Sequence, residues 1–160
     1  MKNKIIIIAS WVCVALTMII IFAFSEENAE KSTQTSSGVI ENVLTIVMPK
    51  DEITDDVVEK YQFPFRKAAH FGIYMLLGFS LANAYINTIK NKPWLSYLLG
   101  LVTGFLYAIS DEWHQGFSAG RWPSFKDVMI DSAGVLVGIG LFVAFISLYK
   151  YFKNRKMPIK

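Results

Sequence analysis

The amino-acid sequence predicts an all-α membrane protein, built as a bundle of four transmembrane helices with both termini in the cytoplasm. Three observations support this fold class. Apolar residues make up 53% of the 160 residues, a larger share than soluble proteins usually have. Four apolar segments each approach the roughly 20 residues needed to cross a bilayer, and lysine and arginine are distributed unevenly around them. The segments are 5–24, 66–89, 95–110 and 128–148.

The first segment, 5–24, has features of both a signal peptide and a membrane anchor. Lys2 and Lys4 precede it, and "AFS" at its end resembles a small-x-small cleavage site. Its apolar run of about 20 residues is longer than the roughly 7 to 15 of a cleaved signal peptide, so we expect it to be retained. The segment contains Cys13, the single cysteine, which excludes an intramolecular disulfide and a cysteine-based metal site.

Basic residues predict the orientation, because lysine and arginine are retained in short cytoplasmic loops. Nine of the sixteen basic residues flank the segments on one side, and all thirteen acids lie on the other side or at its helix ends. The basic side is therefore expected to be cytoplasmic. We expect its tail, 149–160, to anchor the topology at anionic lipid rather than to bind nucleic acid. The nine residues are Lys2, Lys4, Lys90, Lys92, Lys150, Lys153, Arg155, Lys156 and Lys160.

The single domain, 1–160, has two outer loops, 25–65 and 111–127. Apolar residues recur with helical spacing in the first loop, which predicts an amphipathic helix lying on the outer surface. We expect Pro49 and Pro64 to mark the ends of this region by interrupting helical structure. The apolar residues of the predicted helix are Val39, Ile40, Val43, Leu44 and Val47.

Pairs of glycines predict how two of the transmembrane segments pack. Gly100 and Gly104 in the third segment, and Gly134 and Gly138 in the fourth, have the GxxxG spacing that lets helix backbones approach closely in lipid. We therefore expect the third and fourth segments to pack against each other.

Polar side chains from the second, third and fourth segments converge at the outer face. Helical spacing places Arg66, His70 and Tyr74 on one stripe, and Asp127 and Asp131 on another. Ionisable groups within a bundle indicate a functional site by default. The candidate acid, base and orienting groups are His70, Asp111, His114 and Asp131. The candidate ligand-binding residues are Arg66, Lys67, Glu112, Gln115, Arg121 and Asp127.

These residue types suit a phosphate group. The second and fourth segments would present their N-termini outward, where free backbone N–H groups bind anions, and arginine matches phosphate oxygens with two donors. A histidine oriented by Asp111 or Asp131 would serve as a general acid or base. A metal bound by histidines and carboxylates is the rival chemistry. No HxxH or HxxxH pair supports it, and no metal ligand is predicted.

Structural roles also account for some of these residues. Ser124 and Asp127 have the spacing of a capping box, with Ser124 as the N-cap residue. Arg66 and Lys67 have the position of cations that extend to the interface from a transmembrane helix. A salt-bridge cluster that serves folding alone is the structural alternative for the whole group.

Three stretches resemble the VanZ-like family of integral membrane proteins: "RKAAHFGIYMLLG", "YAISDEWHQGFSAGRWPSFKDVMIDSAGVLVG" and, more weakly, "FAFSEENAEKS". The resemblance implies a multi-pass protein of the cell envelope and, for the founding member, lowered sensitivity to teicoplanin-type glycopeptide antibiotics. The motif positions are Arg66, Lys67, His70, Asp111, Glu112, His114, Gln115, Phe117, Gly120, Arg121, Asp127, Asp131 and Gly134.

Two functions follow from these observations. In the first, the outer pocket binds or chemically modifies a phosphate-bearing envelope lipid or wall precursor, as an enzyme or as a binding protein. In the second, the protein is a non-catalytic membrane interaction protein that acts through its acidic outer loop, and the charge cluster is structural. The sequence indicates neither a cofactor nor an oligomeric state.

Overall fold

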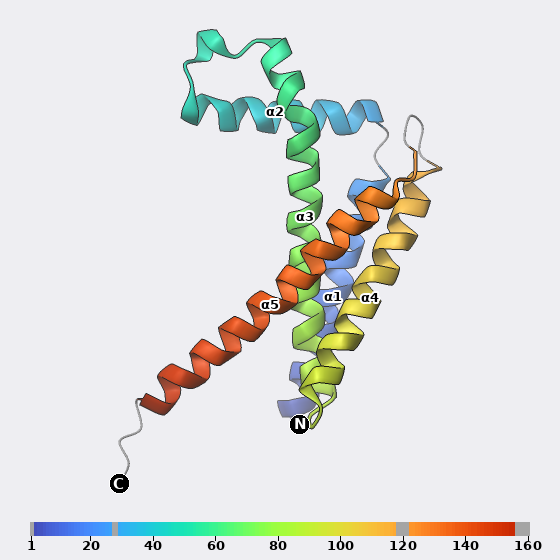
Figure 1. Cartoon of the computed structure of the whole chain (residues 1–160), viewed down its shortest axis with the longest axis vertical. Coiled ribbons are helices and arrows are strands. Elements are labelled where there is room, and N and C mark those ends of the chain that lie inside the picture. Colours follow the sequence, from blue (N-terminus) through green and yellow to red (C-terminus); the bar gives the residue numbers. More distant parts are fainter. Residues whose placement is uncertain (1, 27–28, 118–121, 156–160) are drawn as a thin grey trace.

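The computed structural model describes residues 2–26, 29–117 and 122–155 and confirms the all-α prediction (Figure 1). The described part contains helices and no strand. Four of the helices are long and apolar enough to cross a membrane. The elements are α1 (Lys2–Ser25), α2 (Ala29–Val47), the 3₁₀ turn η1 (Lys50–Glu52), α3 (Asp55–Thr88), α4 (Pro93–Gln115) and α5 (Phe125–Arg155).

Helices α1, α3 and α4 lie side by side, while α5 crosses α3 and its C-terminal half leaves the bundle (Figure 1). Helix α2 lies across one end of the bundle, which we call the α2 end. Large apolar side chains such as Ile5, Leu106 and Phe145 remain exposed on the outer surfaces of the helices. Such surfaces are expected where lipid, rather than water, surrounds the protein.

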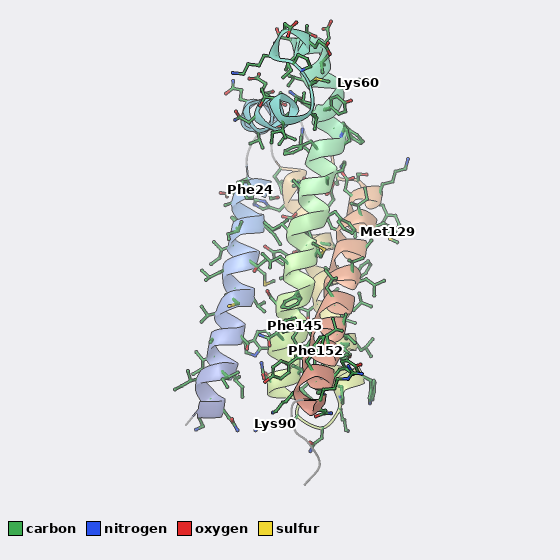
Figure 2. All side chains as sticks on the ribbon, turned by 90° about the vertical axis from the view of Figure 1, so that its left-hand side faces the viewer. Phe24, Lys60, Lys90, Met129, Phe145 and Phe152 are labelled. Atoms are coloured by element: carbon green, nitrogen blue, oxygen red, sulfur yellow. The ribbon has the colours of Figure 1, made fainter. Side chains whose placement is uncertain are left out.

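Helix α3 begins at Asp55, so the predicted start at residue 66 is wrong, as is the predicted break at Pro64. Its 34 residues span roughly 50 Å, and Lys60 lies beyond the level of Phe24 and Met129 (Figure 2). Residues on both sides of Pro64 pack against α2. Val58 joins a small core with Ile40 and Leu44 of α2, and Phe65 packs against it. This packing keeps α3 helical across Pro64, although proline has no backbone N–H to donate a hydrogen bond within the helix.

The two C-terminal helices are also longer than predicted. Helix α4 continues past Ser110 to Gln115, because the polar residues of its last turn are buried against neighbours rather than exposed in a loop. Helix α5 continues through most of the predicted tail to Arg155, since no glycine or proline follows Gly140 before Pro158.

Glycines determine how closely α5 approaches α3, and this pair forms the most extensive helix contact. A Cβ atom at Gly134 would lie 2.5 Å from the Phe71 carbonyl oxygen, and one at Gly138 would meet the Met75 carbonyl. The predicted packing of the third and fourth segments is confirmed, since α4 contacts α5 and Gly104 of α4 packs against Val135 of α5. The glycines of α5, however, face α3 rather than α4. The glycines instead bring the Asp127 and Asp131 stripe of α5 onto α3.

Candidate functional site

A pocket of about 220 Å³ opens between α3, α4 and α5 at the α2 end of the bundle. Pockets for drug-sized ligands usually exceed about 300 Å³, so this one suits a headgroup or a small ion with water. Charged and polar side chains dominate its wall. The lining residues are Phe63, Arg66, Lys67, His70, Glu112, Gln115, Trp122, Asp127, Ile130 and Asp131.

The cations of the pocket lie on α3, about three turns from the start of that helix. The sequence prediction that Arg66 and Lys67 occupy a helix N-terminus is therefore wrong, and the backbone N–H groups at this level belong to the interior of α3. Among the lining helices, only α5 presents its N-terminus at the pocket. Lys67 forms an ion pair with Asp127 in the first turn of α5, and its ammonium lies 5.3 Å from the centre of the Phe63 ring.

The connection between α4 and α5 is held by a different acid from the one predicted. Glu112 Oε1 accepts a hydrogen bond of 2.7 Å from the Ser124 backbone N–H. In a capping box Asp127 would accept that bond, but Asp127 pairs with Lys67 instead. The predicted capping box is therefore wrong in its acidic partner, and Asp127 contributes to the link between α5 and α3.

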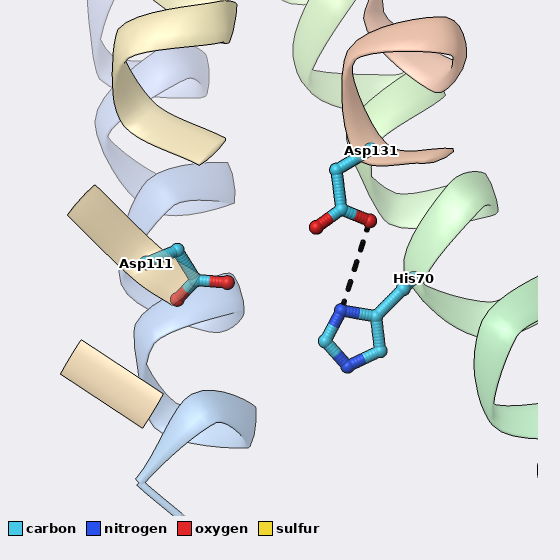
Figure 3. Close-up of side chains that lie close together, drawn as sticks. All are labelled: His70, Asp111 and Asp131. Atoms are coloured by element: carbon cyan, nitrogen blue, oxygen red, sulfur yellow. Dashed lines mark ion pairs between the residues drawn. The ribbon is translucent and has the colours of Figure 1, made fainter. Parts of the chain in front are cut away.

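Three ionisable side chains from three helices meet at the inner end of the pocket (Figure 3). His70 Nδ1 of α3 lies 3.9 Å from Asp131 Oδ1 of α5. Asp111 of α4 lies opposite, and one ligand atom from each of the three residues falls within 4.8 Å of the others. Asp111 is 4% exposed and Asp131 is 1% exposed, so both carboxyl groups are removed from bulk solvent.

Two hydrogen bonds orient the Asp111 carboxyl group. The Tyr74 hydroxyl donates to Asp111 Oδ2 at 3.0 Å, and Gln115 Nε2 donates to the same oxygen at 3.1 Å. Asp111 Oδ1 and Asp131 Oδ2 are buried and have no hydrogen-bond partner. A buried polar atom without a partner is costly, so these two oxygens indicate a place suited to a ligand or a proton.

The structure brings most of the predicted site residues together. His114 is the exception: it lies against Phe22 of α1, with 4.6 Å between the ring centres, and does not line the pocket. Arg121 lies outside the described residues. The predicted residues that line the pocket are Arg66, Lys67, His70, Glu112, Gln115, Asp127 and Asp131, and Asp111 adjoins them.

Four residues of the site were not among the predicted site residues. Tyr74 is fully buried and supports Asp111; its position one turn after His70 on the same stripe was the available indication. Phe63, Trp122 and Ile130 line the pocket, and their sequence pattern resembles that of ordinary interfacial or core residues.

The fold and the site together define a multi-pass membrane protein with a charged pocket at one end of its helical bundle. The chain belongs to the VanZ/LLP1 family, whose model matches residues 10–147. Comparisons with curated proteins and with solved structures gave no match.

Proposed function

We propose that the pocket binds a phosphate-bearing lipid headgroup or wall precursor of the cell envelope. The observation that carries the proposal is the pocket itself, where Arg66 and Lys67 adjoin the half-buried His70 and the buried Asp131. Arginine and lysine supply charge-assisted donors to phosphate oxygens, while a histidine beside a carboxylate is suited to proton transfer.

The position of the pocket fits this ligand. The basic residues of the sequence predict that the α2 end faces outward, and the pocket lies between α3, α4 and α5 at that end. Headgroups occupy this level of a bilayer. A lipid would therefore present its phosphate to the pocket while its chains remain among the exposed apolar side chains. By altering a surface lipid or precursor, the protein would change the access of teicoplanin-type glycopeptides indirectly.

The proposal is tested in cells that express either wild type or His70→Ala at matched membrane abundance. Mass spectrometry of phosphate-bearing lipids and wall precursors should show an envelope molecule whose amount differs between cells with wild type and cells lacking the protein. In cells with His70→Ala, its amount should equal that in cells lacking the protein. Lys60→Gln, an exposed residue of α3 outside the pocket, is the control and should resemble wild type. Identical profiles for wild type and His70→Ala would contradict a chemical role of the pocket.

A second function is favoured by the acidic surface at the α2 end. Its acids are exposed on α2, η1 and the first turns of α3, namely Glu41, Asp51, Glu52, Asp55, Asp56 and Glu59. In this case the protein binds a basic partner without catalysis. Replacing these acids with Asn or Gln should then abolish function with the pocket intact, whereas full retention would exclude this alternative.

A further inference from the structure

We propose that His70, Asp111 and Asp131 bind one divalent cation of the zinc or manganese type at the inner end of the pocket. The three residues come from α3, α4 and α5, so no spacing along the chain reveals them as a ligand set. The site would stand on its own geometry, whether or not the pocket binds a phosphate.

The ligand atoms of the three residues lie slightly farther apart than a bound cation requires. One ligand atom from each residue lies within 4.8 Å of the other two. A point therefore exists within about 2.8 Å of all three atoms, compared with roughly 2.0–2.2 Å in a formed zinc site. Rotation of the two carboxyl groups and the imidazole would have to close this difference when the cation binds.

The two unpartnered oxygens provide an independent indication. Asp111 Oδ1 and Asp131 Oδ2 are both buried without a hydrogen-bond donor, in carboxyl groups that are more than nine-tenths buried. The close-up shows the carboxyl groups of Asp111 and Asp131 and the ring of His70 facing a common space (Figure 3). A cation in that space would satisfy both oxygens.

Charge leads to the same conclusion. Arg66 and Lys67 contribute two positive charges to the pocket, whereas four carboxyl groups, those of Asp111, Glu112, Asp127 and Asp131, contribute up to four negative charges. Buried like charges are unfavourable unless they are compensated. One divalent cation would balance the difference.

The surroundings of the ligands are those of a metal site with an open position. Tyr74 and Gln115 donate to Asp111 Oδ2, which leaves Oδ1 directed to the cation and fixes the carboxyl group, as outer hydrogen bonds do in metal sites. One imidazole and two carboxylates suit zinc or manganese better than the all-oxygen site of calcium. Because the described residues supply three protein ligands, the remaining coordination positions would face the pocket, as in catalytic rather than structural sites.

Binding of Mn²⁺ alone tests the proposal. Full-length protein in lipid nanodiscs is stripped with a chelator and titrated with Mn²⁺, and bound ions are counted by electron paramagnetic resonance. Wild type should bind about one Mn²⁺ per chain and show nitrogen coupling from an imidazole. Zn²⁺ should displace the Mn²⁺. Absence of binding by wild type would overturn the proposal without affecting the proposed lipid binding, which is measured separately.

Variants assign the ligands. Asp111→Asn and Asp131→Asn keep the size of each side chain and should weaken Mn²⁺ binding by about tenfold or more, and His70→Gln should also remove the nitrogen coupling. His114→Gln is the matched histidine control, since His114 packs against α1 rather than lining the pocket, and Asp56→Asn is an exposed carboxylate control on α3. If the variants that elute as intact protein bind Mn²⁺ like wild type, the assignment is wrong. Loss of the nitrogen coupling in His114→Gln would also contradict it.

Discussion

Glu112 Oε1 accepts a hydrogen bond of 2.7 Å from the Ser124 backbone N–H, which ties the last turn of α4 to the residue before α5. Glu112 is 4% exposed, although it follows the end of the apolar segment in the sequence. Because Glu112 lines the pocket, this bond also sets the position of the pocket wall relative to the start of α5.

Removal of this bond should destabilise the junction of α4 and α5. Glu112→Ala leaves the Ser124 N–H without its acceptor and should lower the free energy of unfolding by about 1.5–3 kcal/mol, the range for a hydrogen bond to a charged group. Glu112→Gln keeps an acceptor oxygen and should lose less. Thermal unfolding in detergent measures both. Equal stability of Glu112→Ala and wild type would show that the bond contributes nothing.

Close approach of α3 and α5 should depend on Gly138. A methyl group there would meet the Met75 carbonyl, so Gly138→Ala should destabilise the protein by about 1–3 kcal/mol. At Gly140 on the same helix, a Cβ atom would have nothing within 4 Å, and Gly140→Ala is the matched control that should be neutral or stabilising. Unfolding by a denaturing detergent measures the stability of both variants relative to wild type. Similar effects of both substitutions would contradict the close contact.

Tyr74 should tune the proposed cation site without touching the ion. Tyr74→Phe removes the donor to Asp111 Oδ2 and should weaken Mn²⁺ binding by roughly 10–100-fold. Tyr107→Phe is the control, because that hydroxyl donates instead to the Met18 carbonyl of α1 at 2.7 Å. Titration of each variant with Mn²⁺ in nanodiscs measures the two affinities. If both variants bind Mn²⁺ equally, Tyr74 has no positioning role.

Orientation of the bundle is predicted from charge and is open to a labelling experiment. Single cysteines at Glu59→Cys and Lys153→Cys, both exposed, are introduced after Cys13→Ser removes the native thiol. A membrane-impermeant maleimide added to intact cells should label position 59 and not position 153, because basic segments remain in the cytoplasm. Labelling of position 153 and not of position 59 would show the opposite orientation, with the pocket on the cytoplasmic side.

Much of the site was predictable because the ionisable residues are few and stand out against apolar segments. In such a bundle, helical spacing places Arg66 and His70 on one face and Asp127 and Asp131 on another. Burial of Asp131 also follows from its depth in the helix. These inferences depend only on local periodicity.

What the sequence did not predict depends on contacts between distant residues. Pro64 remains in α3 because Val58 and Phe65 pack on α2, and the α5 glycines face α3 rather than α4. The GxxxG spacing indicates a close contact without naming the partner helix. Likewise, His114 has the motif position and chemistry of a site residue, but the rotation of α4 directs it to Phe22.

The most direct test of the pocket's function is selective binding of a lipid phosphate. Full-length protein is exposed to phosphatidate and to diacylglycerol with the same acyl chains, and bound lipid is counted by native mass spectrometry. Wild type should retain phosphatidate over diacylglycerol, and Arg66→Gln and Lys67→Gln should each weaken its retention by about tenfold, consistent with losing a charge-assisted hydrogen bond. Lys60→Gln should leave retention unchanged. Equal retention of the two lipids by wild type, or no loss in either pocket variant, would contradict the proposal that this pocket binds phosphate headgroups.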